Sequence, residues 1–240
     1  MVPPQLLRTA VALGARTSVG RAKSRCDMAR EGLPFLGGTL ALTLVFWLLS
    51  SWVPALVYGA VCTAALSLFM VFFFRDPNRT PPTGDNLILA AADGKISHIE
   101  HLQHNEHLDS PAIQVSTFLS VFNVHVNRIP LTGTVSFVKW HRGRFHAAFI
   151  AAASTENEQS IIGIRHGKTQ IVVKQIVGIL ARRIVCYLKD SDAVERGDRF
   201  GLIRFGSRVD LILPTSTQLR VEVGDRVRAG ETIIGVIDDV

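Results

Sequence analysis

The chain divides into an apolar N-terminal stretch and a longer region of short apolar runs. No charged residue occurs between Leu33 and Phe74. This stretch is about twice the roughly 20 residues that a helix needs to cross a bilayer. It is interrupted near its middle by the Ser- and Pro-containing segment 50–54, and backbone amides in lipid must be paired within helices. The pattern predicts an α-helical membrane hairpin over residues 33–74, or a re-entrant pair that does not fully cross.

Charge gives this hairpin a direction. The chain has 26 Lys and Arg and 20 Asp and Glu, a net charge of +6. Residues 1–32 form a basic leader with six basic and two acidic residues, or +4, and Arg75 and Arg79 follow the apolar stretch. Basic residues at both ends predict that both ends lie on the cytoplasmic side of a bacterial-type cell membrane (the inner membrane). They indicate anionic lipid as a partner, and no nucleic acid. A secretory signal peptide fits less well, because its apolar core spans only about 7–15 residues.

A turn-rich linker at residues 75–86 leads into a region of different character. Short β-branched runs such as "AIQVSTFLSVF", "TQIVVKQI" and "VDLILP" alternate there with Gly, Pro, Asn and Asp. This alternation predicts a β-rich catalytic domain over residues 87–240 with little helix. The Asp-Gly and Val-Gly-Asp turns near its two ends are typical of a barrel-sandwich hybrid. The segment 174–188, "KQIVGILARRIVCYL", fits either a helix or strands.

Cysteine and histidine spacing predicts no metal site. Cys26, Cys62 and Cys186 lack the paired spacing of a disulfide framework or a zinc knuckle. Histidines recur every three residues between His98 and His107. In a strand that spacing alternates between faces, so the four rings would not meet at one metal.

Three short segments carry residues suited to nucleophilic chemistry. Gly206-Ser207 precedes an apolar strand, and glycine permits a strained backbone beside the serine hydroxyl. Attack of that hydroxyl on the glycine carbonyl would convert the amide to an ester, and it needs a base and a group that orients the base. Asp93, in an Asp-Gly turn, and His125, in a β-like run, are candidates. Each residue also has an ordinary structural interpretation, and their spacing alone does not join them.

Joined together, these segments resemble phosphatidylserine decarboxylase proenzymes in their short, membrane-associated form. The matching segments are "FFFRDPNRTPP", "ADGKI", "FLSVFNVHVNRIPLTG", "ARRIV" and "RFGSRVDLILP", from Phe72 to Pro214. The resemblance implies decarboxylation of phosphatidylserine to phosphatidylethanolamine and carbon dioxide, through a Schiff base to a pyruvoyl group. Self-cleavage at Gly206-Ser207 would create that group and leave a β chain, 1–206, and an α chain, 207–240, as a heterodimer. The sequence leaves open whether these heterodimers assemble into a higher oligomer.

The resemblance also assigns roles to residues. Ser207 becomes the pyruvoyl group, and Asp93 and His125 complete an Asp-His-Ser relay for self-cleavage. His125 is further expected to return a proton to the substrate, since imidazole titrates near neutral pH. Arg128 stands where the longer form has a second histidine. Either His125 therefore serves both steps, or Arg128 and solvent replace part of the relay.

Two other functions fit the same residues. One is a non-enzymatic, membrane-tethered barrel-sandwich domain, such as an adaptor. The other is a serine hydrolase that uses Ser207, His125 and Asp93, although a G-x-S-x-G elbow is absent. Only the pyruvoyl enzyme would yield two chains, the smaller with a blocked N-terminus. Arg75 and Arg79 either attract anionic phosphatidylserine or only set the topology.

Overall fold

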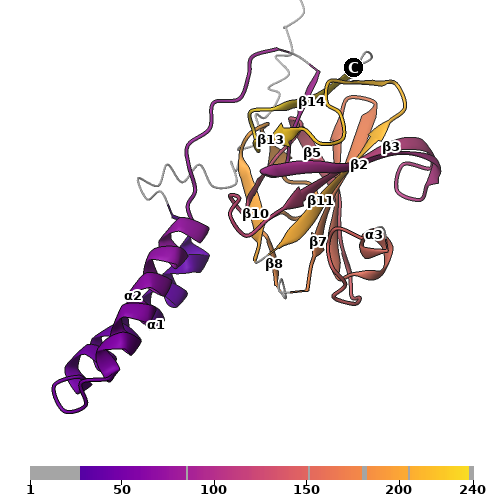
Figure 1. Ribbon diagram of the computed structural model, residues 1–240. Helices are drawn as coiled ribbons and strands as arrows, with labels where there is room; N and C mark the ends of the chain where they lie inside the picture. Colours follow the sequence, from indigo (N-terminus) through magenta and orange to yellow (C-terminus); the bar gives the residue numbers. More distant parts are fainter. Residues whose placement is uncertain (1–27, 85, 151, 180–182, 205, 238–240) are drawn as a thin grey trace, which may run out of the picture.

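The computed structural model of the chain describes residues 28–84, 86–150, 152–179, 183–204 and 206–237. The predicted basic leader lies outside the described residues up to position 27. Figure 1 shows a helical hairpin that projects from a strand-rich barrel.

The apolar stretch forms the hairpin. After a 3₁₀ turn, η1 (Arg30–Gly32), come α1 (Leu33–Leu49) and α2 (Leu56–Phe73). Both helices are long and apolar enough to cross a membrane. Most of their large apolar side chains are exposed in the isolated chain, as expected of surfaces that face lipid.

Small polar residues hold the two helices together. On α2, Gly59, Thr63 and Ser67 recur at four-residue intervals, so they lie along one face. The Thr43 and Thr63 hydroxyls are hydrogen-bonded at 2.9 Å, and the Ser67 hydroxyl donates to Thr39 Oγ1 at 2.8 Å. Small residues and interhelical hydrogen bonds are the usual means of close packing in lipid, where the hydrophobic effect gives no drive.

The remainder of the described chain consists of strands joined by turns, with one short helix, α3 (Ala153–Glu156). The strands are β1 (Leu87–Leu89), β2 (Gly94–Asn105), β3 (Ser110–Leu119), β4 (Val126–Arg128), β5 (Gly133–His141), β6 (Gln159–His166), β7 (Thr169–Val177), β8 (Ile184–Cys186), β9 (Ala193–Val194), β10 (Arg199–Ile203), β11 (Ser207–Pro214), β12 (Thr217–Leu219), β13 (Arg226–Val227) and β14 (Ile233–Ile237). The predicted β-rich domain behind a helical hairpin is confirmed.

Among the described residues, an eight-stranded sheet in the order β13-β2-β3-β11-β7-β6-β5-β9 curls into a half-barrel. Two three-stranded sheets, β1-β14-β12 and β4-β10-β8, accompany it. One apolar core joins all three sheets through residues such as Ile88, Val115, Ile162, Ile203 and Ile234. Sharing of a single core makes the strands one domain rather than separate layers.

Strand β11 occupies the middle of the large sheet. Ser207 pairs with Leu119 of β3 on one side and with Val177 of β7 on the other. Both ladders are antiparallel. The start of β11 and the ends of β3 and β7 therefore meet at one edge of the sheet, which we call the mouth edge.

The hairpin contacts the barrel at this mouth edge. The Phe73 ring at the end of α2 lies 4.1 Å, centroid to centroid, from the His125 ring. Phe73 also packs in an apolar cluster with Leu202 of β10. The guanidinium carbon of Arg204 lies 5.0 Å from the ring centroid of Phe35 in α1. The end of the hairpin next to the barrel thus touches two of the connections that border β11.

Two local expectations are refined. Segment 174–188 was open between helix and strand, and its described residues carry the end of β7 and all of β8. His125, expected within a β-like run, lies one residue before β4, directly after a turn at residues 121–123. That turn interrupts the β-like run in which His125 was expected.

Candidate active site

The serine predicted to be modified begins a buried strand, and its side chain has no hydrogen bond to the part of the chain that the structure describes. Ser207 has no exposed surface, and its Oγ has no partner among the described residues. Gly206, before it, adopts φ +70°, a left-handed conformation that glycine tolerates and other residues resist. A buried hydroxyl normally finds a partner, because leaving it unpaired is unfavourable. The hydroxyl is thus left free beside the carbonyl that it is predicted to attack.

The carbonyl of Gly206 is closely packed from one side. A Cβ added to Gly178, which follows β7, would lie 2.4 Å from the Gly206 oxygen. Only glycine therefore allows the backbone after β7 to approach this carbonyl so closely. Gly178 and Gly206 also line an open apolar pocket of about 130 Å³, together with Phe118, Ala147, Ala148, Phe149 and Ile179.

His125 is held as a neutral base. Its ring is buried, and Nδ1 lies 2.9 Å from the Asn123 carbonyl oxygen. A carbonyl oxygen only accepts, so Nδ1 carries the hydrogen and Nε2 keeps its lone pair. Nε2 is buried and has no partner in the described part of the chain. Burial lowers the pKa of His125 to about 4, the positive charge of Arg75 adds to this, and the Asn123 hydrogen bond opposes it.

This pKa changes one expectation. The sequence predicted that His125 titrates near neutral pH, whereas burial under Phe73 keeps the imidazole uncharged there. A neutral imidazole accepts a proton well but has none to donate from Nε2. In the intact chain His125 therefore suits a base better than an acid.

An internal hydrogen bond brings the surroundings of Ser207 and His125 together. Gln175 Nε2 donates to Asn127 Oδ1 at 2.8 Å, and both residues are fully buried. Gln175 lies two residues before Val177, the partner of Ser207, and Asn127 lies two residues after His125. Two residues of strand span about 7 Å. Both candidate residues thus lie near this pair at the mouth edge.

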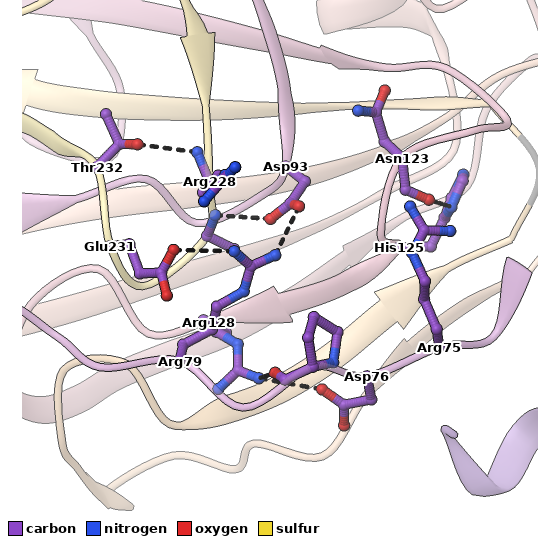
Figure 2. A network of polar contacts seen from close by, with 12 residues as sticks. Arg75, Asp76, Arg79, Asp93, Asn123, His125, Arg128, Arg228, Glu231 and Thr232 are labelled. Atoms are coloured by element: carbon purple, nitrogen blue, oxygen red, sulfur yellow. Dashed lines mark hydrogen bonds and ion pairs between the residues drawn. The ribbon is translucent and has the colours of Figure 1, made fainter. Parts of the chain in front are cut away.

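Asp93 belongs to a separate polar network (Figure 2). Its Oδ1 accepts the Ala229 backbone N–H at 2.8 Å, and its Oδ2 accepts Arg79 at 2.7 Å. Arg79 also binds Glu231 at 2.9 Å. Burial raises the pKa of Asp93, and the Ala229 N–H and the charge of Arg79 oppose that rise.

The complete relay is not assembled in this arrangement. Both carboxylate oxygens of Asp93 are engaged elsewhere, and no described hydrogen bond joins Asp93 to His125 or to Ser207. The Asn123 carbonyl occupies the imidazole N–H that a relay carboxylate would bind. Figure 2 shows the Arg75 guanidinium beside His125, whereas Asp93 is bound to Arg79 in a separate group of contacts.

Arg128 is committed to a structural contact. Its guanidinium binds Asp76 at 3.0 Å, the Pro77 carbonyl at 2.8 Å and the Gly197 carbonyl at 2.9 Å. These bonds tie the start of the linker to the barrel. They leave Arg128 poorly placed to replace part of a proton relay.

Two contributors to the site escaped the sequence analysis. Arg79 was expected to face lipid or to set topology, yet its side chain is 8% exposed and ion-paired with Asp93. No pattern in the sequence announces that pairing. Gly178 had a readable signal, because an isolated glycine in a strand-like run often marks a close backbone approach. The helix–strand ambiguity of its segment obscured this signal.

Comparison with known proteins decides the family. The sequence profile of the phosphatidylserine decarboxylase family matches residues 66–235. The chain belongs to the phosphatidylserine decarboxylase family. It is 44% identical over 215 residues to a phosphatidylserine decarboxylase proenzyme of Geobacter metallireducens, covering 89% of this chain and 98% of that protein.

Two further relatives carry the same name. The proenzyme of Syntrophus aciditrophicus is 44% identical over 212 residues, covering 87% of this chain and 96% of the relative. That of Ralstonia nicotianae is 40% identical over 219 residues, covering 88% and 96%. These matches confirm the resemblance drawn from the sequence motifs. Within this family, the free hydroxyl of Ser207 and the free Nε2 of His125 are the natural candidates for self-processing.

Proposed function

We propose that this chain is a proenzyme that cleaves itself at Gly206-Ser207 and then decarboxylates phosphatidylserine to phosphatidylethanolamine. Membership of the family supports the reaction. The observation that carries the cleavage site is the fully buried, unpaired hydroxyl of Ser207 behind a left-handed glycine. We infer three roles: nucleophile for Ser207, base for His125, and orienting acid for Asp93 as the family resemblance implies.

Self-cleavage follows from these groups. Ser207 Oγ loses its proton to the His125 Nε2 lone pair and attacks the Gly206 carbonyl carbon, and the amide C–N bond breaks to give an ester. Loss of the Ser207 Cα proton then expels the Gly206 carboxylate and leaves dehydroalanine. Water adds to its imine tautomer and ammonia departs, which yields the ketone. With a pKa lowered to about 4, His125 is uncharged at neutral pH, so the Nε2 lone pair is present for the first step.

The relay requires a rearrangement at Asp93. In the intact chain its carboxylate is bound to Arg79 and to the Ala229 N–H. We propose that Asp93 exchanges the Arg79 contact for the imidazole when processing begins. Until then the Asn123 carbonyl keeps His125 in the tautomer that accepts a proton at Nε2.

The residues around Ser207 fit a pyruvoyl group. This group supplies an electron sink for the carboxylate that leaves the substrate. The Ser207 Oγ would leave with Gly206 as part of the new carboxylate, and since that hydroxyl has no hydrogen-bond partner among the described residues, its departure leaves no partner unpaired. The apolar pocket beside Gly206 would exclude water from the reacting head group. We infer that His125 is also the proton carrier for the product.

The two chains would stay together after cleavage. Residues 207–240 contain β11, which lies between β3 and β7 of the larger fragment. They also contain β13 and β14, which pair with β2 and β1. The α chain is therefore interleaved with the β chain, and we propose that they form a heterodimer.

The membrane position follows from the hairpin. Two apolar helices, each long enough to span, support insertion. The basic residues at both ends of the apolar stretch support a cytoplasmic barrel at the bacterial inner membrane. The contact between Phe73 and His125 would then keep the reacting centre next to the lipid surface.

Intact-mass analysis of the purified full chain and of Ser207→Ala tests this proposal. The native chain should give two fragments that separate after residue 206, the smaller lacking a free amine, and should decarboxylate phosphatidylserine in vesicles. Ser207→Ala should remain one chain and be inactive. A native protein that decarboxylates phosphatidylserine as a single chain would overturn the proposed mechanism, and an inactive single chain would favour the hydrolase and adaptor interpretations.

A further inference from the structure

Large apolar side chains surround the mouth edge and face solvent. Among the described residues of the barrel, five of them form what we call the apolar rim: Phe122, Phe145, Phe149, Ile150 and Ile179, with exposed fractions of 67%, 41%, 61%, 38% and 60%. They belong to the connection after β3, the connection between β5 and β6, and the connection after β7. Contiguous exposed apolar surface on a folded domain usually marks an interaction site.

Strand pairing brings these three connections to one edge. Leu119 at the end of β3 pairs with Ser207, which pairs with Val177 at the end of β7. On the neighbouring strands, Ile176 pairs with Gln159, the first residue of β6, and Gln159 pairs with the last residue of β5. The Phe118 and Phe149 rings lie 6.3 Å apart, which places the connection between β5 and β6 against the end of β3.

The rim is continuous with the base of the hairpin. Arg75, just after α2, donates to the Phe122 carbonyl at 2.7 Å. Arg204 lies over Phe35 of α1, and Phe73 packs on His125. In Figure 1 the segment that carries α3 and the ends of β7 and β8 lie at the lower end of the barrel, and the hairpin extends away from the barrel toward the lower left.

Charge around the rim suits an anionic surface. Arg142 and Arg144 flank Gly143 in the connection that carries Phe145, and both are exposed. Arg183, before β8, is also exposed. Apolar side chains with arginines beside them are the composition of protein surfaces that lie in the head-group region of anionic bilayers.

We propose that the apolar rim is a second membrane-contact surface, which lies in the same leaflet as the base of the hairpin. The pocket beside Gly206 is lined by Phe149 and Ile179 of the rim, so it would open directly into that leaflet. The lipid occupant follows from continuity with the hairpin and from the arginines. This inference rests on the proposed function for the identity of the substrate, while contact with the bilayer can be measured separately.

Depth measurement by spin labelling tests the contact. Nitroxide labels are placed at Phe149→Cys, Ile179→Cys, Val223→Cys and Tyr58→Cys of the full chain, in a Cys26→Ser/Cys62→Ser/Cys186→Ser background. The chain is reconstituted in phosphatidylcholine–phosphatidylglycerol nanodiscs. Collision rates with oxygen, which concentrates in lipid, and with a water-soluble nickel chelate give the depth. Val223 is the control, 61% exposed and outside the rim, and Tyr58 on α2 reports insertion of the hairpin.

Each outcome decides the matter. Labels at positions 149 and 179 that favour oxygen, as the label at 58 does, support the proposal, with the label at 223 favouring nickel. Rim labels that behave like the one at 223 overturn it while the hairpin remains inserted. Strong spin–spin broadening at position 179 would indicate a second copy of the chain and also overturn it. A label at 58 that favours nickel would defeat membrane insertion of the hairpin and, with it, this proposal, while self-cleavage and decarboxylation still test the proposed function.

Kinetics give an independent measure. Phe145→Ser/Ile150→Ser alters the rim outside the pocket lining. We expect normal self-cleavage, an unchanged kcat at saturating phosphatidylserine and an interfacial KM raised about tenfold, because two large apolar side chains no longer enter the bilayer. Val223→Ser should match the native chain. Equal KM values for the rim variant and the native chain in phosphatidylserine vesicles would contradict the proposal.

Discussion

Two adjacent residues at the start of β11 contrast sharply. Ser207 faces the interior of the barrel, and its hydroxyl is unpaired among the described residues. Arg208 faces the other side, is 2% exposed and binds Asp210 at 2.6 Å and the Ser116 hydroxyl at 2.7 Å. Asp210 in turn accepts the Ser154 hydroxyl at 2.6 Å. On one face of β11 the Ser207 hydroxyl is unpaired among the described residues, whereas on the other face the buried Arg208 guanidinium makes several hydrogen bonds.

The contrast shows that one residue of the strand is placed to react, whereas the next holds the strand in position. Successive side chains of a strand point to opposite faces, so neighbouring residues can serve unrelated ends. A free hydroxyl beside a left-handed glycine is available for attack, at a cost in stability. A buried, multiply bonded guanidinium one residue later fixes the strand that would become the new chain end. We infer that Arg208 and Asp210 form a clamp that keeps position 207 in place once the backbone is cut.

Removal of the base should have the largest effect on the reactive face. We expect His125→Ala to slow self-cleavage by about 10²- to 10⁴-fold, the usual contribution of a positioned base. The cleaved fraction is followed over time on gels after cell-free synthesis into nanodiscs. His101→Ala, on an exposed position of β2, is the matched control. Normal processing of His125→Ala would mean that Nε2 takes no part in cleavage.

Removal of the clamp should act on stability instead. Arg208→Ala leaves the buried Asp210 with the Ser154 hydroxyl as its hydrogen-bond partner and the Lys174 charge on the neighbouring strand, so we expect the free energy of unfolding to fall by about 3 kcal/mol. Arg208→Met/Asp210→Leu removes both charges and should be more stable than the single variant. Thermal unfolding of both in a Ser207→Ala background, where no cleavage occurs, checks this. A single variant as stable as its parent would show that the pair is no clamp.

The pattern of apolar and polar residues predicted the fold, but it predicted the residues around Ser207 only in part. The charge-free stretch predicted the helical hairpin, and alternating β-branched runs predicted the strands, because both patterns reflect burial. Segment 174–188 was ambiguous because its strands are buried on both faces and so lack alternation. Position 207 was found through its neighbour Gly206, since a left-handed glycine beside a serine is a local feature.

Long-range pairing could not be read in the same way. Arg79 meets Asp93 and Glu231, partners 14 and 152 residues away, and nothing in a linear pattern specifies such contacts. The low pKa of His125 has the same origin, because it depends on burial beneath Phe73, 52 positions earlier in the chain. Composition supplied the residues of the site, and tertiary packing set their protonation.

Crowding of the reacting carbonyl is a finer test of the reactive face. In Gly178→Ala the new Cβ would lie 2.4 Å from the Gly206 oxygen, so that carbonyl must move. We expect cleavage to slow on the order of 100-fold, since small misplacement of reacting atoms is that costly. Gly206→Ala is the informative comparison, because its Cβ meets no atom within 4 Å and the penalty is conformational only. Intact mass over time measures the cleavage rates of both variants. If Gly178→Ala cleaved at the native rate, positioning of the carbonyl by Gly178 would be excluded.

The smallest expected effect concerns the charge that faces Asp93. Burial raises the pKa of Asp93, and Arg79 opposes this, so Arg79→Gln should raise that pKa further. At a given pH less carboxylate is then present. Because Asp93 is predicted to act as the carboxylate, the acid limb of the self-cleavage rate should move to higher pH by about one unit. His125 does not obscure this shift above pH 5, since its own pKa of about 4 keeps it neutral there.

Glu231→Gln is the control. It removes the other partner of Arg79 and leaves the Asp93 pair, so its pH–rate profile should stay near that of the native chain. If Arg79→Gln and the native chain gave the same pH–rate profile, the Arg79–Asp93 pair would take no part in self-cleavage. It would then stabilise the fold, as the Arg208–Asp210 pair does.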